Sequence, residues 1–120
     1  MTSYAVLLPG DESAWERATP EQRAAMYETH GRFAAMLEER GHKITGGAEL
    51  THSRATKQVR RDAAGAVLVS DGPYAETVEQ LTGFYVVETD DLDDLLQVCA
   101  LLAGPDTPVE VRATVDHGGE

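Results

Sequence analysis

The distribution of apolar residues along the chain predicts three strands. Tyr4 to Leu8 are apolar without a helical period and are ended by a Pro-Gly pair, which is typical of a short central strand. Thr82 to Glu88 include a run that is apolar on both faces, so both faces of this strand require cover. Val109 to Val115 alternate between apolar and polar residues, which predicts a half-buried strand.

A long helix is predicted from about Pro20 to Arg40. Thr19 suits the N-cap, proline suits the first helical position, and Gln22 can close a capping box. Gly41 suits the position just after the helix. Three apolar residues share one face at helical spacing: Met26, Phe33 and Leu37. That face is therefore expected to pack on the sheet.

A second helix is predicted with Thr89 or Asp90 as its N-cap and Gly104-Pro105 as its end. Aspartates fill its first turn, where the helix dipole favours negative charge. Its apolar stripe consists of leucines and the single cysteine, Cys99, which we interpret as a small buried hydrophobe. A helical turn is also expected over residues 13–18.

Two further regions predict strands in the middle of the chain. Lys43 to Leu50 can form a strand, in which Gly46 and Gly47 indicate a bulge or a close backbone approach. Thr56 to Arg60 and Ala66 to Val69 flank a turn-like insert and together predict a hairpin.

This order of elements predicts an α+β fold with two helices on one face of an antiparallel sheet, as in ferredoxin-like folds. The other face of the sheet would also be apolar. A symmetric homodimer, sheet against sheet, is the simplest cover for it. Residues 1–120 are expected to form a single domain, because a chain of this length builds one core.

Composition narrows the classes of partner. The formal net charge of −11 would repel nucleic acid and anionic membranes, so neither is expected as a partner. No apolar run approaches the roughly 20 residues of a membrane span, and the N-terminus does not resemble a secretory signal, so we expect a cytoplasmic protein. One cysteine permits neither an internal disulfide nor a cysteine-based zinc cluster.

Residues 69–85, which contain Asp71-Gly72-Pro73-Tyr74, resemble the signature block of the DGPF branch of the YCII-related family. The resemblance extends to Tyr4 to Glu12 and to residues near the C-terminus. It implies a dimeric α+β barrel with a cleft in each protomer. Tyr74 replaces the usual phenylalanine, and Val78 stands where a lysine is common.

The resemblance also bears on function. Some family members are encoded near sigma factors, a related domain is similar to a dehydrochlorinase acting on a chlorinated hydroxyquinol, and a histidine and an aspartate are implicated as a pair.

His30 and Asp71 are the candidate catalytic residues. His30 lies three residues before Phe33 and faces inward, where a neutral imidazole can act as a general base. Asp71 begins a turn that Gly72 and Pro73 stiffen, so its carboxylate is held in place. The alternatives are a hydrogen-bonded core histidine and an aspartate that caps its own turn.

Arg60, Tyr74 and Glu76 are the candidate substrate-binding residues. Arg60 belongs to a short basic stretch and can pair with a carboxylate or phenolate, Tyr74 can donate its hydroxyl, and Glu76 can bind a cation or accept a proton. The alternatives are surface charge balance, packing and solvated loop. The remaining histidines, His42, His52 and His117, have no metal-ligand spacing, and no nucleotide-binding glycine motif is present, so we predict no metal and no cofactor.

Two functions remain open. In the first, a lyase or isomerase acts on a phenolic or keto-acid substrate: His30 abstracts a proton, Asp71 orients the imidazole, and Arg60 or Tyr74 steadies the developing oxyanion. In the second, the chain is a non-catalytic dimeric module that binds a ligand or a protein, in association with a sigma factor.

Overall fold

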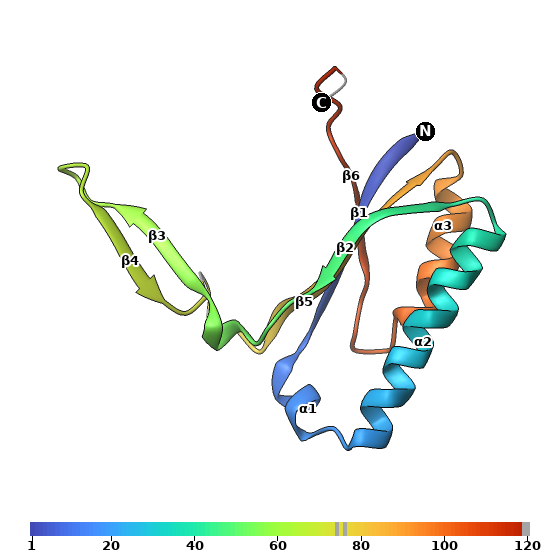
Figure 1. Cartoon of the computed structure of the whole chain (residues 1–120), viewed down its shortest axis with the longest axis horizontal. Helices are drawn as coiled ribbons and strands as arrows, with labels where there is room; N and C mark the ends of the chain where they lie inside the picture. The colour runs from blue at the N-terminus through green and yellow to red at the C-terminus, as the bar shows by residue number, and fades with distance from the viewer. Residues whose placement is uncertain (74, 76, 119–120) are drawn as a thin grey trace.

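The structure is a computed structural model that describes residues 1–73, 75 and 77–118. It is an α+β fold built on an antiparallel sheet (Figure 1). Its elements follow in the order β1 (Thr2–Asp11), α1 (Glu12–Arg17), α2 (Pro20–Glu39), β2 (Lys43–Glu49), η1 (Ser53–Ala55), β3 (Lys57–Arg61), β4 (Val67–Asp71), β5 (Glu79–Thr89), α3 (Leu92–Cys99), η2 (Ala100–Leu102) and β6 (Glu110–Ala113). No helix of the described residues is long and apolar enough to cross a membrane.

The main sheet has the strand order β2-β5-β1-β6, and each neighbouring pair is antiparallel. It is open, with β2 and β6 at its edges, so one chain alone does not close a barrel. The predicted irregularity in β2 is confirmed, because the register shifts between Ile44 and Gly46. Gly47, at φ 146°, comes so close to β5 that a Cβ there would lie 2.5 Å from the Phe84 carbonyl oxygen.

Helices α2 and α3 contribute to one core with the sheet. Val6 of β1 and Val87 of β5 lie in a fully buried cluster with residues from α2 and α3: Phe33, Leu37, Leu95 and Val98. Cys99 is buried in the same cluster, as predicted. The predicted capping box of α2 is confirmed: Gln22 N donates to Thr19 Oγ1 at 3.1 Å, and Thr19 N donates to Gln22 Oε1 at 2.9 Å.

His42 joins α3 to the end of β5. Its side chain is buried, with Nδ1 2.7 Å from Thr89 Oγ1 and Nε2 2.7 Å from Asp94 Oδ2. Arg40 also donates to Asp94, at 2.9 Å. The predicted N-cap of this helix is wrong, because Asp91 rather than Thr89 or Asp90 accepts from the helix backbone.

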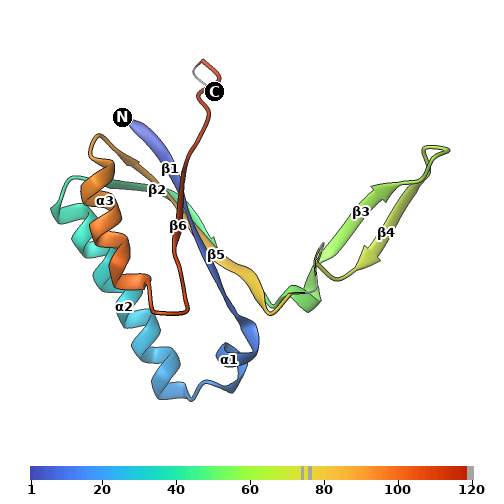
Figure 2. The same cartoon turned by 180° about the vertical axis from the view of Figure 1, so that it is seen from behind.

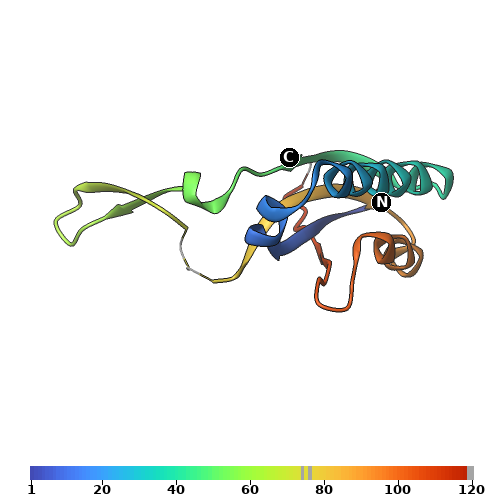
Figure 3. The same cartoon turned by 90° about the horizontal axis from the view of Figure 1, so that it is seen from below.

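The predicted hairpin forms an arm, β3–β4, that extends away from the rest of the molecule (Figures 1 and 2). Figure 3 shows it extending sideways from the layers of sheet and helix. The radius of gyration is 16.9 Å, above the roughly 14 Å expected for a compact domain of this length. The register places Val59, Val67 and Val69 on one face of the arm, where each is more than half exposed.

Candidate active site

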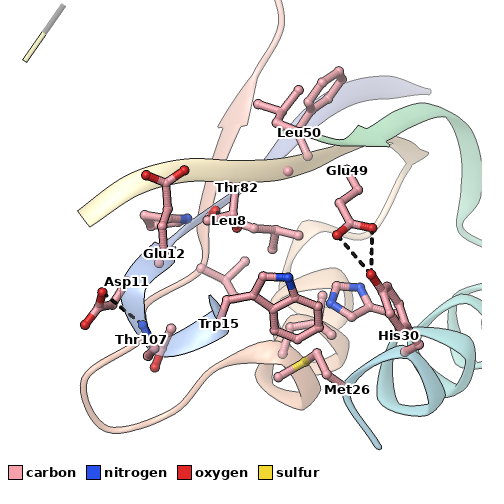
Figure 4. Close-up of a pocket in the computed structure, with 18 of the residues that line it drawn as sticks. Leu8, Asp11, Glu12, Trp15, Met26, His30, Glu49, Leu50, Thr82 and Thr107 are labelled. Carbon is pink, nitrogen blue, oxygen red and sulfur yellow. Dashed lines mark hydrogen bonds between the residues drawn. The ribbon is translucent and has the colours of Figure 1, made fainter. Parts of the chain in front are cut away.

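A large open cleft lies at one end of the sheet, beside α1 and the first half of α2 (Figure 4). Its volume is about 990 Å³, which is ample for a small organic molecule. Apolar and aromatic side chains form most of its wall: Leu8, Trp15, Met26, Tyr27, Leu50, Phe84, Tyr85 and Val109. These residues come from distant parts of the sequence, so the fold is what assembles the cleft.

The short helix α1 carries Trp15 into the wall of the cleft. Asp11 caps this helix by accepting from Ser13 N at 2.9 Å and from Ala14 N at 3.3 Å. Arg23 of α2 fixes the other end, because its guanidinium donates to the Trp15 carbonyl at 3.0 Å and lies 5.3 Å from the centre of the indole ring. Trp15 is the only tryptophan of the chain, so its fluorescence reports on the cleft.

His30 of α2 and Tyr85 of β5 form a hydrogen-bonded pair in the wall of the cleft. His30 Nδ1 lies 2.6 Å from the Tyr85 hydroxyl, and the two rings stack with centroids 5.9 Å apart. Burial lowers the pKa of His30, an effect that the charge of Glu49 partly opposes. Burial also raises the pKa of Tyr85. Near neutral pH both groups are therefore uncharged.

A neutral histidine–tyrosine pair can both accept and donate a proton. In one tautomer His30 Nδ1–H donates to the Tyr85 oxygen, which leaves Nε2 as a base and the phenolic O–H as a donor. In the other tautomer the phenol donates to Nδ1, and Nε2–H is the donor. The geometry serves acid–base chemistry in either arrangement.

Glu49, in the last position of β2, lies beside this pair. Tyr27 donates its hydroxyl to the two carboxylate oxygens, at 3.1 and 3.0 Å, and this hydrogen bond raises the pKa of Tyr27. The Tyr27 ring meets the Trp15 ring edge to face, with centroids 5.6 Å apart. Trp15, Tyr27 and Glu49 therefore form one continuous stretch of the wall.

Two further carboxylates of α1 line the cleft. Glu12 is buried and accepts from both the backbone N and the Oγ of Ser53, each at 2.6 Å. Glu16 is held by both terminal nitrogens of the Arg54 guanidinium, at 2.8 and 2.9 Å, and this hydrogen bonding lowers the pKa of Glu16. His52, from the loop after β2, lies 3.7 Å from Glu12 and 3.5 Å from Glu16.

The residues predicted from the sequence lie in two separate places. His30 lines the cleft, whereas Asp71 ends β4 on the arm and forms an exposed ion pair with Lys57. Arg60, in β3, faces Leu68 across the arm. Neither Asp71 nor Arg60 belongs to the wall of the cleft within one chain. A joint role of these residues with His30 stays a prediction.

Tyr74 and Glu76, the other two predicted binding residues, lie outside the described residues. Sequence reasoning missed Tyr85, Trp15 and Glu49. A tryptophan beside a helix start was a usable signal for Trp15, and the position of Tyr85 two residues before Val87 places it on the helix-facing side of its strand. Nothing in the local sequence indicates Glu49.

The fold and this cleft define a small α+β protein with a ligand-sized site and no metal cluster among the described residues. Residues 2–103 match the YCII-related domain, and the chain belongs to that family. An uncharacterized protein of Rhizobium meliloti is 36% identical over 112 residues, which cover 91% of this chain and 89% of that relative.

Proposed function

We propose that the cleft binds a small, mostly apolar organic molecule and that His30 and Tyr85 transfer protons to and from it, in chemistry of the lyase or isomerase type. The observation that carries this proposal is the 2.6 Å contact between His30 Nδ1 and the Tyr85 hydroxyl in the wall of a roughly 990 Å³ cleft. A neutral imidazole is a general base suited to neutral pH, and the phenol supplies a donor for a developing oxyanion.

The lining favours a phenolic substrate over a keto acid. Aromatic walls suit an aromatic ring, which packs edge to face or offset against them. A keto acid carries a carboxylate, which would enter a cleft already lined by Glu12 and Glu49. Among the two substrate classes suggested by the sequence, the phenolic one is therefore the better match.

Proton exchange tests this proposal directly. A panel of phenols and enolisable ketones in D₂O is followed by NMR for loss of carbon-bound hydrogen at ring or α positions. We expect exchange of at least one class to be accelerated by the protein, and His30→Gln to reduce that acceleration by about 10²-fold or more. His117→Gln, in the exposed C-terminal region, is the matched control. Equal exchange by the two variants would remove His30 from the mechanism.

A second candidate function is a dimeric binding module, and the arm is the observation that favours it. A two-stranded hairpin is marginally stable alone in water, and this one exposes Val59, Val67 and Val69 on one face. We infer that a second copy of the chain covers this face and forms the homodimer, with a sigma factor as the competing protein partner. Asp71 and Arg60 would then act at an interface between copies.

Light scattering at micromolar concentration checks the dimer. We expect a dimeric mass for the wild-type chain and a shift toward monomer for Val59→Ser combined with Val69→Ser. A wild-type monomer would contradict this reading.

We also propose that the chain belongs to the DGPF branch of the family, because it carries the Asp71-Gly72-Pro73 block.

A further inference from the structure

The charged groups that line the cleft are unevenly distributed. Four acidic residues face it: Asp11, Glu12, Glu16 and Glu49. Among the described residues of the wall there is no lysine and no arginine. An anionic ligand would therefore find no lysine or arginine within the described wall of the cleft and would meet carboxylates instead.

The partners of these carboxylates decide which of them keeps its charge uncompensated. The negative charge of Glu16 is compensated by its bidentate ion pair with Arg54. Glu12 accepts from the Ser53 backbone and hydroxyl and lies 3.7 Å from His52, whereas Glu49 is held only by a neutral donor, the Tyr27 hydroxyl. Hydrogen bonds from neutral groups hold a carboxylate in position without cancelling its charge.

Arg23 is a second cation close to this wall. Its guanidinium is engaged with the Trp15 and Glu16 carbonyl oxygens, at 3.0 and 3.1 Å, and it packs over the indole ring. It does not itself belong to the wall of the cleft. Arg23 therefore positions Trp15 and leaves Glu49 free to receive a ligand.

The aromatic rings beside Glu49 complete the recognition chemistry. Trp15 and Tyr27 meet edge to face, and the Tyr27 hydroxyl reaches Glu49. An ammonium group attracts both a carboxylate and the face of an aromatic ring, and such cages of aromatic rings recognise amines. We propose that the cleft selects an aromatic amine, with the ammonium group at Glu49 and the ring against Trp15. This inference rests on the proposed ligand-binding function of the cleft.

Three phenols that differ only in the group at the para position test the inference: tyramine, which carries an ammonium group, its neutral alcohol counterpart tyrosol, and para-hydroxyphenylacetate. Binding is followed by Trp15 fluorescence, excited at the red edge of the indole band, where phenols absorb little. We expect tyramine to bind about tenfold tighter than tyrosol, and para-hydroxyphenylacetate to bind weakest. Added salt should weaken tyramine binding selectively.

Variants separate the charge of Glu49 from the shape of the cleft. Glu49→Gln is expected to weaken tyramine about tenfold and to leave tyrosol within twofold. Glu38→Gln, on the exposed side of α2, is the matched control and should change neither affinity. Because Glu49 is exposed, its replacement does not disturb the core.

The outcomes are distinct. Tighter binding of para-hydroxyphenylacetate than of tyramine, equal binding of all three phenols, or a Glu49→Gln variant that keeps full tyramine affinity would overturn the amine preference while leaving the cleft as a ligand site. Binding of none of the three would overturn the proposed function and this inference together.

Discussion

His42 is buried and bridges Thr89 and Asp94, so its replacement should lower stability without affecting ligand binding in the cleft. This distinguishes it from His30, which lines the cleft. His42→Leu keeps the apolar bulk and removes two hydrogen bonds, to Thr89 and to Asp94. A hydrogen bond to a neutral group contributes about 0.5–1.5 kcal/mol and one to a charged group about 1.5–3 kcal/mol. Thr89 still accepts from the Asp91 backbone N–H, and Asp94 still accepts from Arg40, so each group keeps one hydrogen bond. We therefore expect the free energy of unfolding to fall by about 2 kcal/mol, the lower end of the summed range.

Thermal and urea unfolding followed by circular dichroism measure this loss. For a chain of this length an unfolding free-energy change of 1 kcal/mol shifts Tm by about 4 °C, so we expect a decrease of about 8 °C with an unchanged urea m-value. Binding of tyrosol, read from Trp15, should be unaffected. His117→Leu is the control and should leave Tm in place. A loss below about 0.5 kcal/mol for His42→Leu would refute the bridging role of His42.

Other residues of the cleft and the core give four further predictions. Tyr85→Phe should slow proton exchange more than it weakens ligand binding, measured by NMR and Trp15 fluorescence. Gly47→Ala should destabilise the fold, seen as a lower urea midpoint, because its Cβ would collide with the Phe84 carbonyl. Burial lowers the pKa of His30 because it favours the neutral imidazole. The free energy of unfolding should therefore be highest above the ordinary histidine pKa and decrease as the pH falls below it. The lowered pKa of Asp94, due first to its hydrogen bond from His42, should make stability fall as the solution is acidified below the ordinary aspartate pKa, in urea titrations against pH.

Apolar periodicity predicted the sheet strands, the hairpin and the long helix, because each depends on local pattern. The ends of the strands were less predictable. β1 and β5 continue beyond their apolar cores, since Gly10 pairs with Gln80 and Asp11 with Glu79 after a bulge at Pro9. Pairing between strands, rather than the residues themselves, sets these ends.

Long-range contacts explain why the N-cap of α3 and the partner of His30 were not predicted from the sequence. Thr89 does not cap α3, because its hydroxyl accepts from Asp91 N and meets His42, 47 residues earlier. His30 was predictable as inward-facing from its helical spacing to Phe33. Its partner Tyr85 was not, because 55 residues separate them and only the placement of β5 beneath α2 brings them together.

If His30 acts on a ligand, a small molecule must reach its imidazole in the cleft. Histidine-selective ¹⁵N NMR during a titration with tyrosol tests it most directly, since the four histidines are distinct in environment. We expect the His30 ring nitrogens to shift in step with Trp15 quenching, while those of buried His42 and exposed His117 stay in place. Trp15 quenching without any shift of His30, or shifts confined to the other histidines, would contradict it.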